Sequence, residues 1–264
     1  MKRSEAVTFS ALFGVLIVVG GFVGVQAWRA PRRAPPATAE GAKSADAASD
    51  EAGNGLGSVR GSSLPPPPPR DYAQISRLLA EGAGATYMDA VLTARGGNVA
   101  RWVERRADPV TVWIQRTTTL RDFWPEYRDR ARDAFYTWAA SGIPVRFLFV
   151  DDSANAEVHV AWVDRFDDSA AGKTYWARDK NWWIVGADIE IALHRPTGEP
   201  YDQQGIRTIA LHEVGHLIGL DHSPNPEDVM SPKVHVTALS AADLRTAALI
   251  YKLPPGPVSK PAAP

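Results

Sequence analysis

The pattern of apolar and polar positions changes along the chain, and the changes divide it into segments. Residues 6–28 contain no charged side chain, and residues 30–70, which follow, are rich in Ala, Pro, Gly and Ser. From about residue 108 onward, short runs typical of strands are interleaved with runs at helical spacing. We therefore expect the packed part of the protein to be smaller than the whole chain and to lie mainly in this second half.

Residues 108–254 predict a compact domain of the α/β (α+β) class. Strands are expected at 110–115, 145–150, 156–163, 173–177 and 183–193. Helical spacing predicts one helix over 125–140 and another over 240–251, where Ser240 and Asp243 form a capping box. A strand-helix-strand start followed by a run of strands is typical of a twisted mixed sheet with helices packed against it. Residues 255–264 are predicted to be a flexible tail.

Residues 71–107, before this domain, predict one or two short helices, around 72–81 and 87–94. Glycines at positions 82, 84, 96 and 97 interrupt the pattern. The segment is consistent with a propeptide, with an N-terminal clasp on the domain, or with packing near a membrane. Our default prediction is an added layer of core.

The N-terminal residues 1–29 predict a signal or membrane anchor. Segment 6–28 is about long enough to cross a bilayer and longer than the apolar core of an ordinary cleaved signal. Val25-Gln26-Ala27 nevertheless resembles a cleavage site, so a cleaved signal remains the alternative to the uncleaved anchor that we favour. Either would place the domain outside the cytoplasm, in the cell envelope or secreted. Residues 30–70 have too few large apolar residues to bury a core and predict a disordered tether.

The composition excludes several classes of function. The net charge of −1 gives no electrostatic basis for binding nucleic acid. The chain has no cysteine, which excludes disulfides, thiol catalysis and cysteine metal ligands. Nothing in the sequence indicates an oligomeric state.

Candidate chemistry is concentrated between His212 and His222. Because His212 and His216 are four residues apart, a helix places them on one face, where both imidazoles can reach the same zinc ion. Glu213 can lie near a water bound to that ion. His222 does not fit the same face, but Gly219 can take the left-handed conformation that ends a helix and turn the chain back. Three neutral nitrogen ligands leave a fourth position open, which is the arrangement of a catalytic zinc.

The pattern His-Glu-x-x-His-x-x-Gly-x-x-His resembles the metzincin signature. Met230, eight residues after His222, resembles the Met-turn of these proteins and is expected to form an apolar floor beneath the zinc. Ser223, directly after the third histidine, and Pro232, two residues after Met230, resemble the residues at these positions in the matrixin branch. The resemblance spans residues 108–253 and is densest from 206 to 232. It implies a metzincin-like zinc-protease domain with an active-site helix and a C-terminal helix, and an endopeptidase acting on protein or peptide substrates.

The predicted mechanism uses one catalytic Zn²⁺ held by His212, His216 and His222, which polarises the scissile carbonyl and activates water. Glu213 is expected to act as general base toward the water and then as general acid toward the leaving amine. One alternative is a zinc amidase acting on cell-wall peptides. Another is a non-catalytic binding module of the envelope, although an inactive descendant is expected to lose Glu213 or a ligand, and none is lost.

The resemblance also implies two substrate-binding elements. Matrixins pair an extended substrate with an edge strand beside the zinc, for which Lys173–Ala177 is the candidate. The loop after the Met-turn forms one wall of their specificity pocket, and Lys233–Leu239, which contains His235, corresponds to it.

Further metal sites are less well supported by the sequence. Matrixins usually hold a second, structural zinc through three histidines and an aspartate, but residues 186–191 carry an acidic residue where a histidine is expected. We therefore expect His159 and His194 to be ordinary strand residues and the chain to hold one zinc. An acidic loop offers oxygen ligands for Ca²⁺, with a solvated turn as the alternative; it contains Asp164, Asp167 and Asp168.

Overall fold

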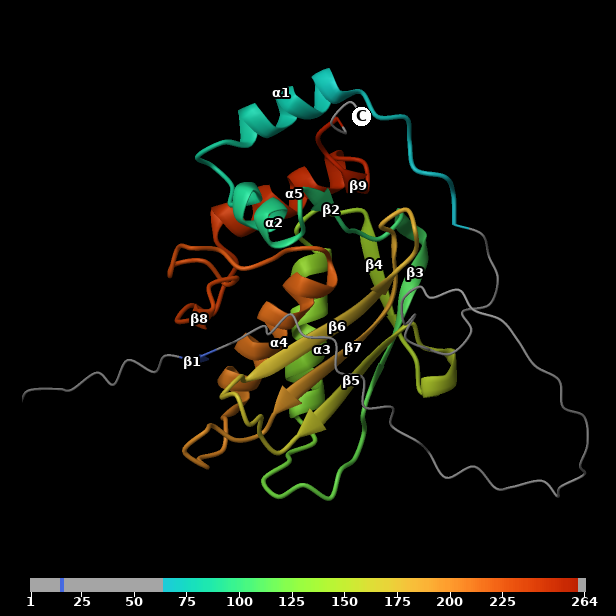
Figure 1. Ribbon diagram of the computed structural model, residues 1–264. Helices are drawn as coiled ribbons and strands as arrows, with labels where there is room; N and C mark the ends of the chain where they lie inside the picture. The colour runs from blue at the N-terminus through green and yellow to red at the C-terminus, as the bar shows by residue number, and fades with distance from the viewer. Residues whose placement is uncertain (1–14, 17–63, 261–264) are drawn as a thin grey trace, which may run out of the picture. The chain divides into compact units, whose positions relative to one another are not determined.

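The computed structural model describes residues 64–260 and the backbone of β1, Val15–Leu16 (Figure 1). The predicted anchor at 6–28 lies outside the described residues apart from β1, and so does the predicted tether up to residue 63. β1 pairs antiparallel with β8, Lys233–Val234, in the loop that follows the Met-turn. Within the described part of the chain, no helix is long and apolar enough to cross a membrane.

A five-stranded mixed sheet, in the order β4-β3-β5-β7-β6, organises the domain. Its strands are β3 (Arg105–Ile114), β4 (Val145–Phe149), β5 (Val158–Val163), β6 (Gly172–Arg178) and β7 (Ile184–Ala192). β4, β3, β5 and β7 are parallel to one another, and β6 runs antiparallel to β7 at the edge of the sheet. The predicted mixed sheet is confirmed, and the strand expected at 173–177 is an edge strand.

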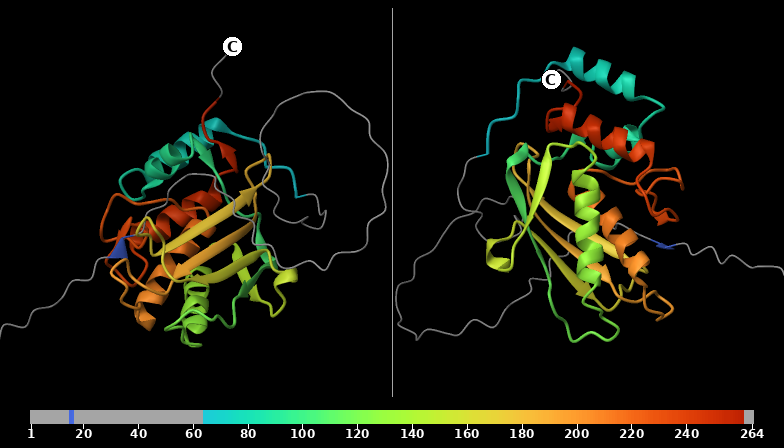
Figure 2. Two further views of the ribbon diagram at one scale, coloured as in Figure 1. Left: turned by 60° about the horizontal axis from the view of Figure 1, so that its bottom comes forward. Right: turned by 180° about the vertical axis from the view of Figure 1, so that it is seen from behind.

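Two helices, α3 (Tyr127–Ala139) and α4 (Gln203–Leu217), pack against the same face of the sheet (Figure 2). α3 connects the adjacent parallel strands β3 and β4, which require a crossover of this kind. Its apolar positions Ala131, Phe135 and Trp138 are buried, as the helical spacing predicts. Trp138 Nε1 also donates a 2.8 Å hydrogen bond to the carbonyl oxygen of Leu211 and so ties α3 to α4.

A second group of helices lies together at one end of the molecule (Figure 1): α1 (Tyr72–Gly82), α2 (Met88–Ala94) and α5 (Ala241–Lys252). Ile75, Met88 and Val91 are buried, so residues 71–107 do contribute a layer of core. α5 begins with the predicted capping box of Ser240 and Asp243.

The structure moves the predicted borders of the domain. β3 begins at Arg105, inside the segment assigned to the extension, because Arg105 pairs with Val145 of β4. Its side chain also forms a two-pronged ion pair with Glu157 at 2.6 and 2.8 Å. The predicted flexible tail is wrong for its first residues. β9 (Gly256–Pro257) pairs antiparallel with β2 (Asn98–Val99), and backbone pairing of this kind leaves no signal in side-chain periodicity.

The described end of the predicted tether, residues 64–70, contacts the domain, contrary to a free tether. Trp183 Nε1 donates to the carbonyl oxygen of Pro65 at 3.0 Å, and Arg70 Nη2 donates to that of Pro255 at 2.8 Å. The remaining short element, the 3-10 helix Ser153–Asn155, precedes β5.

Candidate metal centre

α4 is the helix that carries the candidate ligands. It begins at Gln203, and its N-cap is Asp202, whose side chain accepts a 2.7 Å hydrogen bond from the backbone N–H of Gly205. From Thr208 to Leu217 every residue is buried, so the helix has no solvent-exposed face along its second half. A polar side chain on such a helix loses its hydration and needs a specific partner. Burying the side chains of His212, Glu213 and His216 therefore costs free energy unless each has a polar partner or a bound ion.

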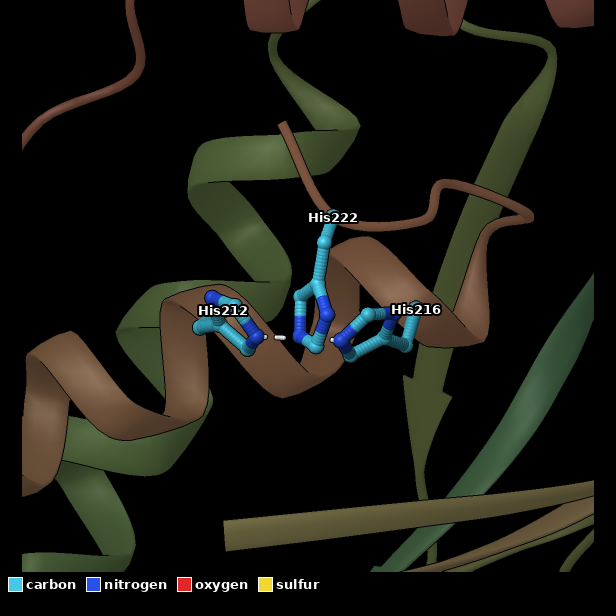
Figure 3. Close-up of side chains that lie close together, drawn as sticks. All are labelled: His212, His216 and His222. Atoms are coloured by element: carbon cyan, nitrogen blue, oxygen red, sulfur yellow. Dashed lines mark hydrogen bonds between the residues drawn. The ribbon is translucent and has the colours of Figure 1, made fainter. Parts of the chain in front are cut away.

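The turn after α4 brings the third histidine back. α4 ends at Leu217, and Gly219 has a φ of +107°, a conformation that favours glycine. A Cβ at Gly219 would also collide with the carbonyl oxygen of Ala100. The chain then reverses, and His222 lies over the helix beside His212 and His216 (Figure 3). The glycine turn predicted from the sequence is confirmed.

The three imidazoles converge, with one ring nitrogen of each within 4.8 Å of the others. His212 Nδ1 lies 2.7 Å from the carbonyl oxygen of Val229, and His216 Nδ1 lies 3.2 Å from that of Leu220. A carbonyl oxygen only accepts, so both Nδ1 atoms carry the proton and both Nε2 atoms present lone pairs.

These two Nε2 atoms lie 3.0 Å apart (Figure 3). Two lone pairs at this distance repel each other unless a cation lies between them. Nε2 of His222 is buried and has no hydrogen-bond partner among the described residues. The donor set therefore fits a tetrahedral metal with an open fourth position, for which zinc is the usual ion.

The protonation states suit this arrangement. Burial lowers the pKa of His216 to about 3, with repulsion from His222 as the second cause. Burial also lowers the pKa of His212 well below its usual value, and it lowers that of His222. All three imidazoles are therefore neutral near pH 7, which is the form that binds metal.

The segment after His222 supports the site from below. The backbone N–H of Ser223 donates to the carbonyl oxygen of Met230 at 2.8 Å, which closes the loop between them. Met230 is fully buried against α4, and a Cβ at Gly215 would collide with its sulfur. The predicted apolar floor thus packs against Gly215, a position of the helix that has no side chain.

A carboxylate from α5 holds the same segment in place. Asp243 Oδ2 accepts a 2.9 Å hydrogen bond from the backbone N–H of Val229, whose carbonyl oxygen orients His212. Asp243 Oδ1 accepts another from the hydroxyl of Tyr87, also at 2.9 Å. The sequence indicated Asp243 only as a helix cap, and its link to His212 appears only in three dimensions.

Glu213 is completely buried, and its two carboxylate oxygens differ. Oε2 accepts a 2.7 Å hydrogen bond from the hydroxyl of Thr174 on β6, whereas Oε1 has no hydrogen-bond partner among the described residues. A Cβ at Gly172 would lie 2.5 Å from Oε1, so β6 leaves just enough room for the carboxylate. Burial raises the pKa of Glu213 to about 8, against the opposing effect of the Thr174 hydrogen bond.

With this geometry established, comparison with known proteins identifies the family. The family model described as Matrixin matches residues 101–252, more than half of the chain. The chain belongs to the matrixin family. No curated protein matches it. Matrixins are zinc metallopeptidases, so membership supports a hydrolase that uses zinc and acts on protein or peptide substrates.

The other histidines of this matrixin have different neighbours. His159 Nε2 lies 2.9 Å from the carbonyl oxygen of Ser153, and its Nδ1 lies 3.3 Å from Asp188 Oδ1. The buried ring of His194 lies between Asp122 and Asp164, each 2.9 Å from one of its nitrogens. His235 is exposed in the loop 233–239. In the described part of the chain, the cluster of His212, His216 and His222 is the only group of three or more candidate metal ligands.

The calcium prediction therefore finds no support in the described residues. Asp164 faces His194, and Asp168 Oδ2 accepts a 2.7 Å hydrogen bond from Lys173 Nζ. Side chains already paired with cationic groups or imidazole are poorly placed to converge on one cation.

Proposed function

We propose that this matrixin is an endopeptidase whose zinc is held by His212, His216 and His222. The observation that carries the proposal is the pair of Nε2 lone pairs held 3.0 Å apart in a buried, neutral cluster. Without a cation such an arrangement is costly, because the tautomers are fixed from the other side of each ring. Bound there, zinc would polarise a scissile carbonyl and lower the pKa of water.

Glu213 is proposed as the group that moves the proton. Its Oε1 has no other partner, so it can accept a proton from the attacking water and pass it to the departing amine. Thr174 is a positioning residue in this proposal: its hydroxyl holds Oε2 and so aims Oε1.

The free edge of β6 is proposed as the place where substrate binds. β6 is an edge strand, so the backbone groups on its outer side can pair with an extended peptide. Since Thr174 and Gly172 on this strand also contact Glu213, a peptide on β6 would run close to the general base. Specificity is expected to depend on the loop 233–239, in which Val234 is buried and Lys233 and His235 are exposed.

The proposed site of action is outside the cytoplasmic membrane. Support comes from the uncharged segment 6–28 and the basic residues Lys2 and Arg3 that precede it. If the segment is an uncleaved anchor, the full-length protein will stay in the membrane fraction after a carbonate wash. A mature N-terminus near Trp28 in the soluble fraction would favour the cleaved signal.

The decisive experiment compares Glu213→Ala with Glu227→Ala, a matched control at an exposed position in the loop between His222 and Met230. Cleavage of a random peptide library is measured together with the zinc content of each variant. Wild type and the control should cleave internal peptide bonds and lose activity to a chelator. Glu213→Ala should keep its zinc but lose activity by about 10²-fold to 10⁴-fold.

Comparable activity in a zinc-loaded Glu213→Ala protein would remove Glu213 from the mechanism. Failure of wild type to cleave any library peptide, with cell-wall peptides cleaved instead, would favour the amidase.

A further inference from the structure

Arg95, at the end of α2, makes an unusual set of contacts for a residue of the N-terminal extension. Its Nη1 donates to the carbonyl oxygen of Gly219 at 2.5 Å, and its Nη2 donates to that of Leu220 at 2.7 Å. Its Nε lies 3.6 Å from Asp221 Oδ2. The Arg95 side chain is only 7% exposed, so these contacts are shielded from water.

These partners are the three consecutive residues just before His222, in the turn that follows α4. The last carbonyl groups of a helix and of the turn after it have no partners within the helix, and a guanidinium is well suited to bind them. Asp221 also accepts a 2.8 Å hydrogen bond from the backbone N–H of His222. The carboxylate thus joins Arg95 to the backbone of the third histidine.

Other residues of the extension restrain the same turn. The carbonyl oxygen of Ala100 lies where a Cβ of Gly219 would be, and the fully buried Val99 precedes it. The Arg95 guanidinium carbon lies 5.3 Å from the ring centre of Trp176, on the edge strand β6. Arg95 therefore contacts both the turn that carries His222 and the strand that covers Glu213.

We propose that the extension is a permanent part of the zinc site and that Arg95 is a positioning residue for His222. Arg95 lies outside residues 101–252, which match the matrixin family, so the proposal concerns a feature of this chain. It rests on the proposed function, because positioning His222 matters only if His222 binds zinc. The guanidinium fixes the turn in the conformation in which His222 meets the other two histidines, before any metal binds.

The same contacts decide between the roles open to residues 71–107. A propeptide that is cut away after activation would take Arg95 with it, leaving the carbonyl group of Gly219 without its partner and that of Leu220 with only the contact to His216 Nδ1. It would also remove β2 from β9 and uncover the buried Ile75, Met88 and Val91. A permanent clasp has neither cost. The active protein should therefore retain residues 71–100.

The test measures zinc affinity in the full-length chain, by competition with a chelator of known affinity. Arg95→Ala removes all contacts of the side chain with the turn, whereas Arg95→Gln keeps a shorter, uncharged side chain with a single donor nitrogen in place of the guanidinium fork. Arg70→Ala is the matched control, because Arg70 also donates to a backbone carbonyl, that of Pro255, away from the histidines. The absorption spectrum of the cobalt-substituted protein reports ligand geometry as a second readout.

The proposal predicts a zinc dissociation constant raised on the order of tenfold to a hundredfold in Arg95→Ala, less in Arg95→Gln, with an altered cobalt spectrum in each. Arg70→Ala should match wild type in both readouts, even if its melting temperature falls. A folded Arg95 variant that binds zinc within twofold of wild type would overturn the inference, as would an active protein that has lost residues 71–100. If wild type itself binds no zinc, the proposed function fails instead.

Discussion

The six histidines of this chain form two groups that differ in their neighbours: those of the metal cluster and those outside it. The rings of His212 and His194 are both buried and both lie close to other polar groups. His212 has a carbonyl oxygen at one nitrogen and two further imidazoles at the other. His194 has a carboxylate at each nitrogen.

Burial alone therefore does not distinguish a metal ligand from a structural histidine. In the cluster, the backbone takes the one proton of each ring and leaves a lone pair pointing inward, toward other lone pairs. In His194 and His159, each ring nitrogen lies within 3.3 Å of an oxygen atom instead of another imidazole nitrogen, and neither ring belongs to a cluster of candidate ligands in the described residues. The groups that face the two ring nitrogens decide what the residue can do.

The largest expected effect comes from removing one nitrogen from the cluster. His216→Ala should lose tight zinc binding and reduce peptide cleavage by several orders of magnitude, because two imidazoles cannot complete the site. His159→Ala should leave both unchanged. Zinc affinity and cleavage rate, measured on the same preparations, check this. Loss of zinc from both variants would erase the distinction between the groups.

A smaller effect is expected from the residue that holds Glu213. Thr174→Val leaves Oε2 of Glu213 buried without its hydrogen bond, which should lower kcat by about 10-fold to 100-fold. Zinc affinity and KM should change little, since the hydroxyl faces the carboxylate and not the substrate edge. Thr174→Ser restores the hydroxyl and should recover most of the activity. Equal losses in the two variants would point to packing instead of the hydrogen bond.

His194 should affect stability without affecting the metal. His194→Leu deprives Asp122 and Asp164 of their shared partner and should lower the free energy of unfolding by about 1–3 kcal/mol. Urea denaturation of the zinc-loaded variant measures the loss, and chelator competition measures zinc affinity. A weakened zinc affinity in the folded variant would mean that the two groups are coupled.

The smallest effect is a dependence of stability on pH at His159. The hydrogen bond with Asp188 raises its pKa, although burial opposes this. Protonated His159 therefore stabilises the folded state fully below its unfolded pKa of about 6.5, and this contribution disappears as the pH rises through the folded pKa. Because the pair is more than a third exposed, the contribution should stay below about 1 kcal/mol.

Asp188→Asn is the variant that isolates this contribution. Its free energy of unfolding, measured by denaturant titration at several pH values from 6 to 9, should approach that of wild type at the alkaline end. A difference from wild type that grows with pH would contradict the sign.

The parts of the site that follow from local spacing were predictable from sequence. Two histidines four residues apart share a helix face, and Gly219 marks the point where the helix must end. The edge strand and the capping box of α5 likewise follow from short-range patterns.

The supporting contacts were not predictable, because they join residues far apart in the chain. Arg95 precedes Gly96 and Gly97, which indicate only that the helical pattern ends there, and nothing in the nearby sequence indicates that the Arg95 side chain is buried. Thr174 lies within the predicted edge strand, but its contact with Glu213 depends on how β6 crosses α4. β9 has two residues and is held by backbone pairing with β2, which no side-chain pattern records.

X-ray absorption at the zinc edge tests the central claim most directly, on full-length protein dialysed to constant metal content. The account predicts one zinc per chain with three imidazole nitrogens at about 2.0–2.1 Å and one further oxygen ligand. A single zinc with fewer than three imidazoles would contradict the assignment of His212, His216 and His222, and a second zinc would contradict the expectation that these three form the one metal site.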